Sequence, residues 1–234
     1  LSSTDYFDIA ASVARPSYSR SYEKKIVNSV YGKASFGFRD FLYVDGTIRN
    51  DWSSALPEAN NSYLYPSLSS SFIFTELLKI NWLSYGKLRA SYASVGSDLG
   101  AHSLDLAINN GNFYGSNASV TIGNQFKGGG IRPALTKAYE VGLELKLFRK
   151  IVFVVTVYQN NNTDQILGVD VSSASGFSTA QINAGNIVSQ GIEVSLNGKP
   201  IETKNFVWET SINWAKNQNE IKELAPGINT YLYA

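Results

Sequence analysis

The sequence contains no cysteine, no methionine and a single histidine, His102. Without cysteine the chain has no disulfide framework and no thiol chemistry, and a histidine–cysteine metal site is excluded within it. A Ser-His-Asp site would have to combine His102 with its neighbours Ser103 and Asp105, and neighbours within one polar loop are weak evidence for a triad. We therefore expect no catalytic site, no metal site and no cofactor.

The sequence also has no excess of charge of one sign and no long apolar run. Lys and Arg number 20 against 19 for Asp and Glu, which gives a net charge of +1 and no indication of a nucleic-acid partner. No run approaches the ~18 apolar residues of a membrane helix, but this does not exclude a membrane barrel, whose strands are half polar. The chain opens with LSSTDYFDIA, without Met or a signal peptide, and we expect it to be a piece of a longer protein.

Alternation of apolar and polar residues is the dominant pattern. In residues 139–147 the odd positions are Tyr, Val or Leu, whereas Glu140, Glu144 and Lys146 occupy even positions. Successive side chains of a strand point to opposite faces, so this pattern predicts a β-strand, and residues 136–167 predict a hairpin. Comparable runs occupy residues 26–38, 41–52, 63–74, 87–95, 185–197 and 206–217. The sequence therefore predicts an all-β antiparallel meander of about eight strands.

The connections between these runs alternate in length. A tight Arg39-Asp40 turn and the Arg149-Lys150 junction join hairpins, and residues 75–86 form a connector with one helical turn. The longer connections, including residues 96–135 and roughly 160–183, fall at the other end of the meander. Short turns at one end, long loops at the other and strands of about ten residues are typical of an outer-membrane barrel. A soluble sandwich shows the same alternation but does not require this asymmetry.

Two sets of residues follow from the barrel interpretation. Charged residues on the polar face are candidates for lining the lumen, either along a solute path or as a solvated wall with cross-strand ion pairs. Aromatic residues near strand ends are candidates for the membrane interfaces. The lumen-facing candidates are Asp45, Arg49, Asp51, Arg89, Glu140, Glu144, Lys146, Glu193 and Glu209. The interface candidates are Tyr43, Trp52, Tyr65, Tyr139 and Trp208.

Several longer stretches carry a family resemblance. They are VYGKASFGFRDFLYVDGTIRNDWSS (30–54), YPSLSSSFIF (65–74), WLSYGKLRASYASVGS (82–97), TKAYEVGLELKLF (136–148), residues 158–167 and NAGNIVSQGIEVSLNG (183–198). In order and spacing they resemble the barrel of SusC/RagA-type TonB-dependent outer-membrane transporters of Bacteroidetes. The resemblance extends over most of the chain.

This resemblance implies a part of a large transmembrane barrel of about 22 strands in the bacterial outer membrane. It further implies import of oligosaccharides or peptides, driven through TonB, with a SusD-like surface lipoprotein as partner and outer-membrane lipid around the barrel. We expect residues 1–234 to form a partial barrel of this kind, with the plug, the TonB-contacting segment and the closing C-terminal strand outside it. The protein would then not be an enzyme.

Three alternatives remain open at this point. A passive porin or a small stand-alone barrel would have the same strands without TonB dependence. A soluble all-β binding module would bury Leu143, Leu145 and Leu147 in a core. A barrel-embedded hydrolase would depend on His102.

Overall fold

The computed structural model describes residues 22–106, 108–111, 115 and 117–224, and most of this part is β-structure. The long strands are β1 (Val27–Phe38), β2 (Leu42–Ser53), β3 (Ser62–Ile73), β4 (Leu83–Ser97), β8 (Ala134–Leu147), β9 (Ile151–Asp170), β10 (Thr179–Glu202) and β11 (Val207–Glu223). The short elements are β5 (Ile108–Asn110), β6 (Val120–Ile122), β7 (Gln125–Lys127) and the 3-10 helices η2 (Glu58–Asn60), η3 (Phe74–Glu76) and η4 (Ser173–Ser175). Within the described residues no helix is long and apolar enough to cross a bilayer.

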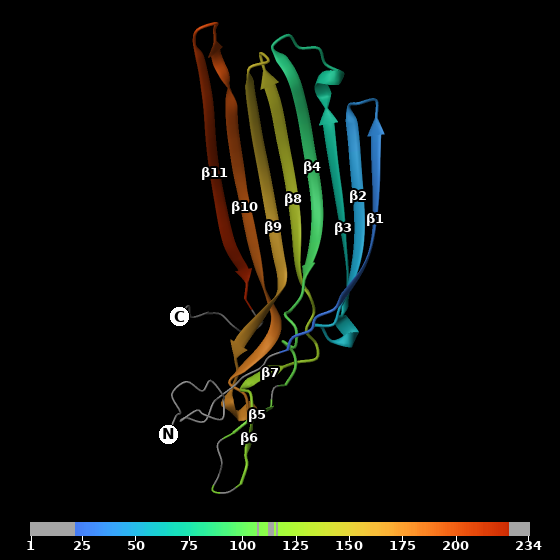
Figure 1. Ribbon diagram of the computed structural model, residues 1–234, viewed down its shortest axis with the longest axis vertical. Coiled ribbons are helices and arrows are strands. Elements are labelled where there is room, and N and C mark those ends of the chain that lie inside the picture. Colours follow the sequence, from blue (N-terminus) through green and yellow to red (C-terminus); the bar gives the residue numbers. More distant parts are fainter. Residues whose placement is uncertain (1–21, 107, 112–114, 116, 225–234) are drawn as a thin grey trace, which may run out of the picture.

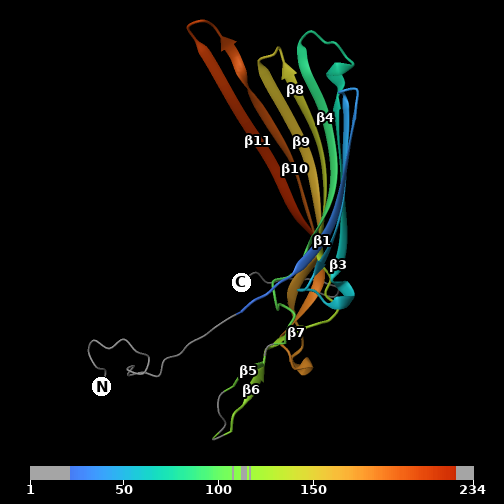
Figure 2. The same ribbon diagram turned by 45° about the vertical axis from the view of Figure 1, so that its right-hand side comes forward.

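The long strands form one antiparallel meander, as the alternation predicted. Their order in the sheet is β1-β2-β3-β4-β8-β9-β10-β11, with β7 added in parallel to the start of β10. Figures 1 and 2 show a single curved sheet with β1 and β11 at its opposite edges. Among the described residues no second layer covers either face of this sheet, which is unlike a two-layer sandwich.

Short and long connections separate to opposite ends of the sheet (Figure 1). The β1–β2 turn places Arg39 and Asp40 at φ 48° and 57°, and the β8–β9 turn places Phe148 and Arg149 at φ 52° and 62°. Positive φ at both central residues is typical of type I′ turns, whose twist matches that of the flanking strands. The expected helical turn after β3 is the 3-10 helix η3. The short-turn end is thus trimmed, and the long-loop end carries η2, β5, β6, β7 and η4.

The register divides the sheet into two faces that persist from edge to edge. One row of paired residues runs Leu42, Phe72, Leu88, Leu143, Val155, Val194 and Trp214. The adjacent row runs Tyr43, Ser71, Arg89, Gly142, Thr156, Glu193 and Ala215. Because paired residues share a face, we call the first set and its alternate neighbours the apolar face and the second set the polar face. The described residues leave the apolar face uncovered: Val141, Val157 and Ile212 are 53%, 52% and 57% exposed.

The prediction of a loop at roughly residues 160–183 is wrong. Strand β9 continues to Asp170 and β10 begins at Thr179, so the β9–β10 hairpin extends well past its neighbours. The polar run at residues 159–165 lacks apolar alternation, but its backbone groups pair across the hairpin in register. A small cluster of Val169, Ala180 and Ala184 supports the extension. Strand β4 also starts earlier than predicted, at Leu83.

Candidate functional site: the polar face and the long-loop end

Ion pairs cross the polar face from β1 to β8. The Arg49 Nε lies 2.7 Å from Asp51 Oδ1, and Lys87 Nζ lies 2.7 Å from Glu144 Oε2 on the neighbouring strand. Asp45 accepts a hydrogen bond from Ser35 at 2.5 Å, with Lys33 Nζ at 3.8 Å. The register places these candidates on one face of the sheet, and their charges are largely neutralised by neighbours.

Asp51 is the most enclosed of the predicted charged residues, with only 5% of its surface exposed. Its carboxylate accepts hydrogen bonds from the Arg49 guanidinium and from the Tyr65 hydroxyl. Arg49 also donates to Ser29 Oγ at 2.9 Å, and Tyr65 stacks on Tyr63 with ring centroids 5.8 Å apart. A buried carboxylate is stable only when it is paired and hydrogen-bonded. This network therefore fixes β1, β2 and β3 to one another near the long-loop end.

Arg89 connects three strands at the middle of the polar face. Its Nη1 lies 2.8 Å from Glu140 Oε1 on β8, and its Nη2 donates to Thr156 Oγ1 on β9 at 2.7 Å. The guanidinium crosses the position of Gly142, where an added Cβ would lie 2.3 Å from Arg89 Nε. A residue without a side chain is thus required opposite Arg89 for this arrangement.

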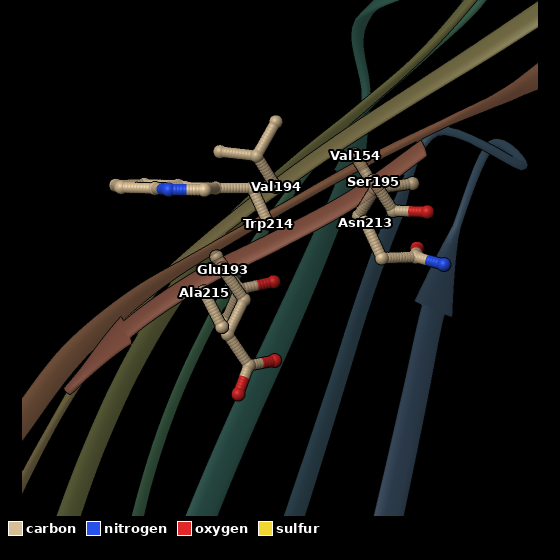
Figure 3. Close-up of a pocket in the computed structure, with 8 residues that line it drawn as sticks. Val154, Glu193, Val194, Ser195, Asn213, Trp214 and Ala215 are labelled. Atoms are coloured by element: carbon tan, nitrogen blue, oxygen red, sulfur yellow. The ribbon is translucent and has the colours of Figure 1, made fainter. Parts of the chain in front are cut away.

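The polar face of β9 to β11 has a different character. Glu193 has no hydrogen bond or ion pair to any other described residue, and it borders a shallow depression of about 240 Å³. Figure 3 shows Glu193 and Asn213 on one side of the ribbon and Val194 and Trp214 on the other. Lys146, on the adjacent strand β8, also has no ion pair within the described part of the chain. Glu209 lies near the short-turn end, where its carboxylate is 2.7 Å from Lys199 Nζ.

Two of the aromatic interface candidates lie on the wrong face. Tyr43 and Tyr65 pair in register with Ser71 and Arg49, so they belong to the polar face and not to the apolar face. Position near a strand end was the basis of the prediction, and it says nothing about which face a side chain takes. Trp52, Tyr139 and Trp208 keep apolar-face parity and are 40%, 46% and 51% exposed. The alternation of the sequence already indicated the polar face for both tyrosines. Tyr43 is an even number of residues from Asp45 and Arg49 on the same strand, and Tyr65 pairs with Arg49.

The long-loop end is held by an anchor at the end of β4 that sequence analysis missed. The Asp98 carboxylate accepts a hydrogen bond from Lys25 Nζ at 2.6 Å and another from the Ser53 hydroxyl. Lys25 Nζ also donates to the Leu99 carbonyl at 2.9 Å. Segments 73 residues apart, before β1 and after β4, are therefore joined across the ends of β2 and β3.

A second anchor centres on Asn183 of β10. Its amide nitrogen donates to the carbonyl oxygens of Arg132 at 2.7 Å and Asp164 at 2.9 Å, and its side-chain oxygen accepts from the Arg132 N–H at 2.7 Å. The Arg132 guanidinium in turn lies 2.6 Å from the Asp164 carboxylate. Asn183 is the first residue of the NAGN motif (residues 183–186), and Gly185 of the same motif has φ 83°. The motif thus positions the long excursion between β4 and β8.

The comparisons with known proteins agree with this geometry. The family model described as "TonB dependent receptor-like, beta-barrel" matches residues 2–233, and the chain therefore belongs to that family. Its sheet is part of an outer-membrane β-barrel.

Individual relatives share modest identity over most of the chain. TonB-dependent receptor P39 of Formosa agariphila is 28% identical over 203 residues, which cover 85% of this chain and 20% of that protein. TonB-dependent receptor SusC of Bacteroides thetaiotaomicron is 26% identical over 221 residues, covering 88% of this chain and 22% of that protein. A structure of the RagAB peptide importer superposes with a TM-score of 0.81 at 25% identity, covering 88% of this chain and 23% of that chain. The chain spans about a fifth of the length of the curated relatives it matches.

Proposed function

We propose that this chain is a section of the barrel wall of a transporter that imports oligosaccharides or peptides across the outer membrane. The import is driven through TonB, which contacts a segment outside this chain, and a SusD-like lipoprotein works with the barrel at the cell surface. The chain itself makes and breaks no covalent bonds. The likeness to SusC and to the RagAB peptide importer supports the proposal.

The single observation that carries it is the two-faced, single-layer sheet with its elaborated end. A closed barrel of such strands leaves no backbone group unpaired in lipid. The apolar face would then contact lipid, and the polar face would line the interior, where the nine charged candidates contact water, plug or solute. Trp52, Tyr139 and Trp208 would lie at the membrane interfaces.

Cysteines introduced one at a time allow a direct test of facing, because residues 1–234 contain none, and the unsubstituted full-length protein serves as the labelling control. Glu193→Cys and Val194→Cys place adjacent thiols on opposite faces of β10. In outer membranes that contain the full-length protein, we expect a water-soluble maleimide to label position 193 and a lipid-dissolved reagent to label position 194. Equal labelling of both positions by the water-soluble reagent would contradict the proposed facing.

Energy coupling is tested by uptake in cells that carry the full-length protein. We expect labelled oligosaccharide or peptide to accumulate, and the accumulation to cease after loss of TonB or addition of a proton uncoupler. Uptake that continues unchanged under both conditions would instead indicate a passive porin.

A further inference from the structure

A pocket lies among the loops at the long-loop end, and none of the lumen-facing or interface candidates lines it. It has a volume of about 260 Å³ and is bounded by Lys24, Leu56, Leu104, Asp105, Lys127 and Gly128. These residues come from the segment before β1, the β2–β3 loop and both halves of the β4–β8 excursion. We call this cavity the loop pocket.

The position of the loop pocket is fixed by contacts between these segments. Ala55 and Leu56 are each only 7% exposed, and the Ser53 hydroxyl accepts a hydrogen bond from the Ala55 N–H. Ser53 in turn donates to Asp98, the first anchor described above. In the same β2–β3 loop, Asn60 Nδ2 donates to the carbonyl of Ile131, which is 3% exposed. The pocket is therefore built on a buried base.

The charges around the loop pocket favour an anion. Lys127 Nζ donates to the Asp105 carbonyl at 3.0 Å and retains further donors, because an ammonium group has three. Lys24 makes no hydrogen bond or ion pair to any other described residue. The carboxylate of Asp105 is already engaged by His102 Nδ1 at 2.6 Å. Two ammonium groups thus face one engaged carboxylate, so the site has a surplus of positive charge.

The uncharged lining points to the chemical class of the ligand. Leu56, Leu104 and Pro57 contribute aliphatic surface, and no Phe, Tyr or Trp is among the described residues that line the pocket. Ligand sites are mostly apolar with a few placed polar groups, and drug-sized ligands occupy about 300–1,000 Å³. A cavity of 260 Å³ therefore suits the end of a longer molecule, with an aliphatic side chain on the leucines and a carboxylate at the lysines.

From this arrangement we infer that the loop pocket binds the carboxyl-terminal residue of a peptide with an aliphatic side chain. The inference rests on the proposed function and specifies its substrate class, since it selects peptides with a free carboxyl end over neutral oligosaccharides. Lys24 and Lys127 would hold the carboxylate, and Leu56 and Leu104 would contact the side chain.

The test uses the full-length transporter in detergent and two synthetic probes, Ala-Ala-Ala-Ala-Leu with a free carboxylate and the same peptide with a terminal amide. Hydrogen bonds to charged groups are the stronger ones, so calorimetry should show the acid bound about tenfold more tightly than the amide. Lys127→Gln and Lys24→Gln should each lower this ratio toward one. Lys79→Gln removes the same charge at the short-turn end and should leave the ratio unchanged.

Three results would overturn the inference. The first is equal binding of the acid and the amide to the unmodified protein. The second is an acid-to-amide ratio that survives both pocket substitutions. The third is displacement of the acid peptide by trigalacturonate, together with weaker binding of trigalacturonate in Lys127→Gln. The last result would assign the pocket to acidic sugars. Uptake that is sensitive to a proton uncoupler is measured on the same variants. If that uptake persists while the acid-to-amide ratio is one, the loop pocket assignment fails and the proposed import function stands.

Discussion

The polar face differs between its two halves. From β1 to β8 it carries ion pairs that join neighbouring strands, such as Arg89 with Glu140 and Lys87 with Glu144. From β9 to β11 the described residues of the same face carry one such pair, Lys199 with Glu209 near the short-turn end, and Glu193 stands among Thr156, Ser195, Asn213 and Ala215. The apolar face shows no such division. Ion pairing across strands thus joins β4 to β8 in the middle of one half, and Arg89 extends this contact to β9, whereas the middle of the other half carries Glu193, unpaired among the described residues, beside small and uncharged ones.

The largest expected effect on the free energy of unfolding concerns the apolar face. Leu143 and Val194 lie in one row of the apolar face, on β8 and β10, and both pair with Val155. An arginine on a lipid-facing strand position near mid-membrane costs about 2–4 kcal/mol. We expect Leu143→Arg and Val194→Arg to lower the free energy of unfolding of the full-length barrel by similar amounts, measured by urea unfolding in lipid vesicles. Ser195→Arg, on the polar face, is the matched control, and an equal loss there would refute the facing.

The next effect separates the halves directly. Asp51→Ala removes the acceptor shared by Arg49 and Tyr65 and leaves both without it, at a cost of about 2–3 kcal/mol. Glu193→Ala removes a carboxylate without a partner among the described residues, so its cost should stay within about 0.5 kcal/mol. The same urea unfolding measures both. Similar losses for the two carboxylates would show that the halves are energetically alike.

A smaller effect is expected where Arg89 crosses Gly142. Gly142→Val would force the guanidinium off Glu140 and Thr156, because an added Cβ lies 2.3 Å from Arg89 Nε. Overpacking of this kind costs about 1–3 kcal/mol. Gly46→Val on β2 is the control, since an added Cβ at Gly46 meets nothing within 4 Å. Unfolding curves that shift equally for both variants would remove the requirement for glycine at position 142.

The smallest effect is that of a single exposed pair. Glu144→Gln breaks the ion pair with Lys87. The side chains of Lys87 and Glu144 are 26% and 32% exposed. Partly exposed pairs contribute about 0.2–1 kcal/mol and are screened by salt. The difference between the variant and the unmodified barrel should therefore shrink as sodium chloride rises from 0.05 to about 1 M. A loss that is independent of salt would indicate that packing, and not charge, is what the pair provides.

The sequence by itself predicted the eight long strands, their antiparallel meander and their two faces, but not the full length of β9 and β10. Alternation has a period of two only in extended chain, so the residues of the apolar row, from Leu42 to Trp214, separate from the charged ones without any knowledge of their neighbours. The same parity would have assigned Tyr43 and Tyr65 to the polar face. Family resemblance then identified the class of barrel, which the family comparison confirmed.

Only the tertiary structure decided which strands meet in which register, and hence which charges meet. Arg89 finds Glu140 and Thr156 because register brings β4, β8 and β9 together, and no pattern within one strand specifies that. The continuation of β9 to Asp170 depends on backbone pairing with β10, which polar residues do not signal. The anchors at Asp98 and Asn183, and the loop pocket beside Lys24 and Lys127, join segments far apart in the chain. Their contacts exist only because the folded sheet brings those segments to one end.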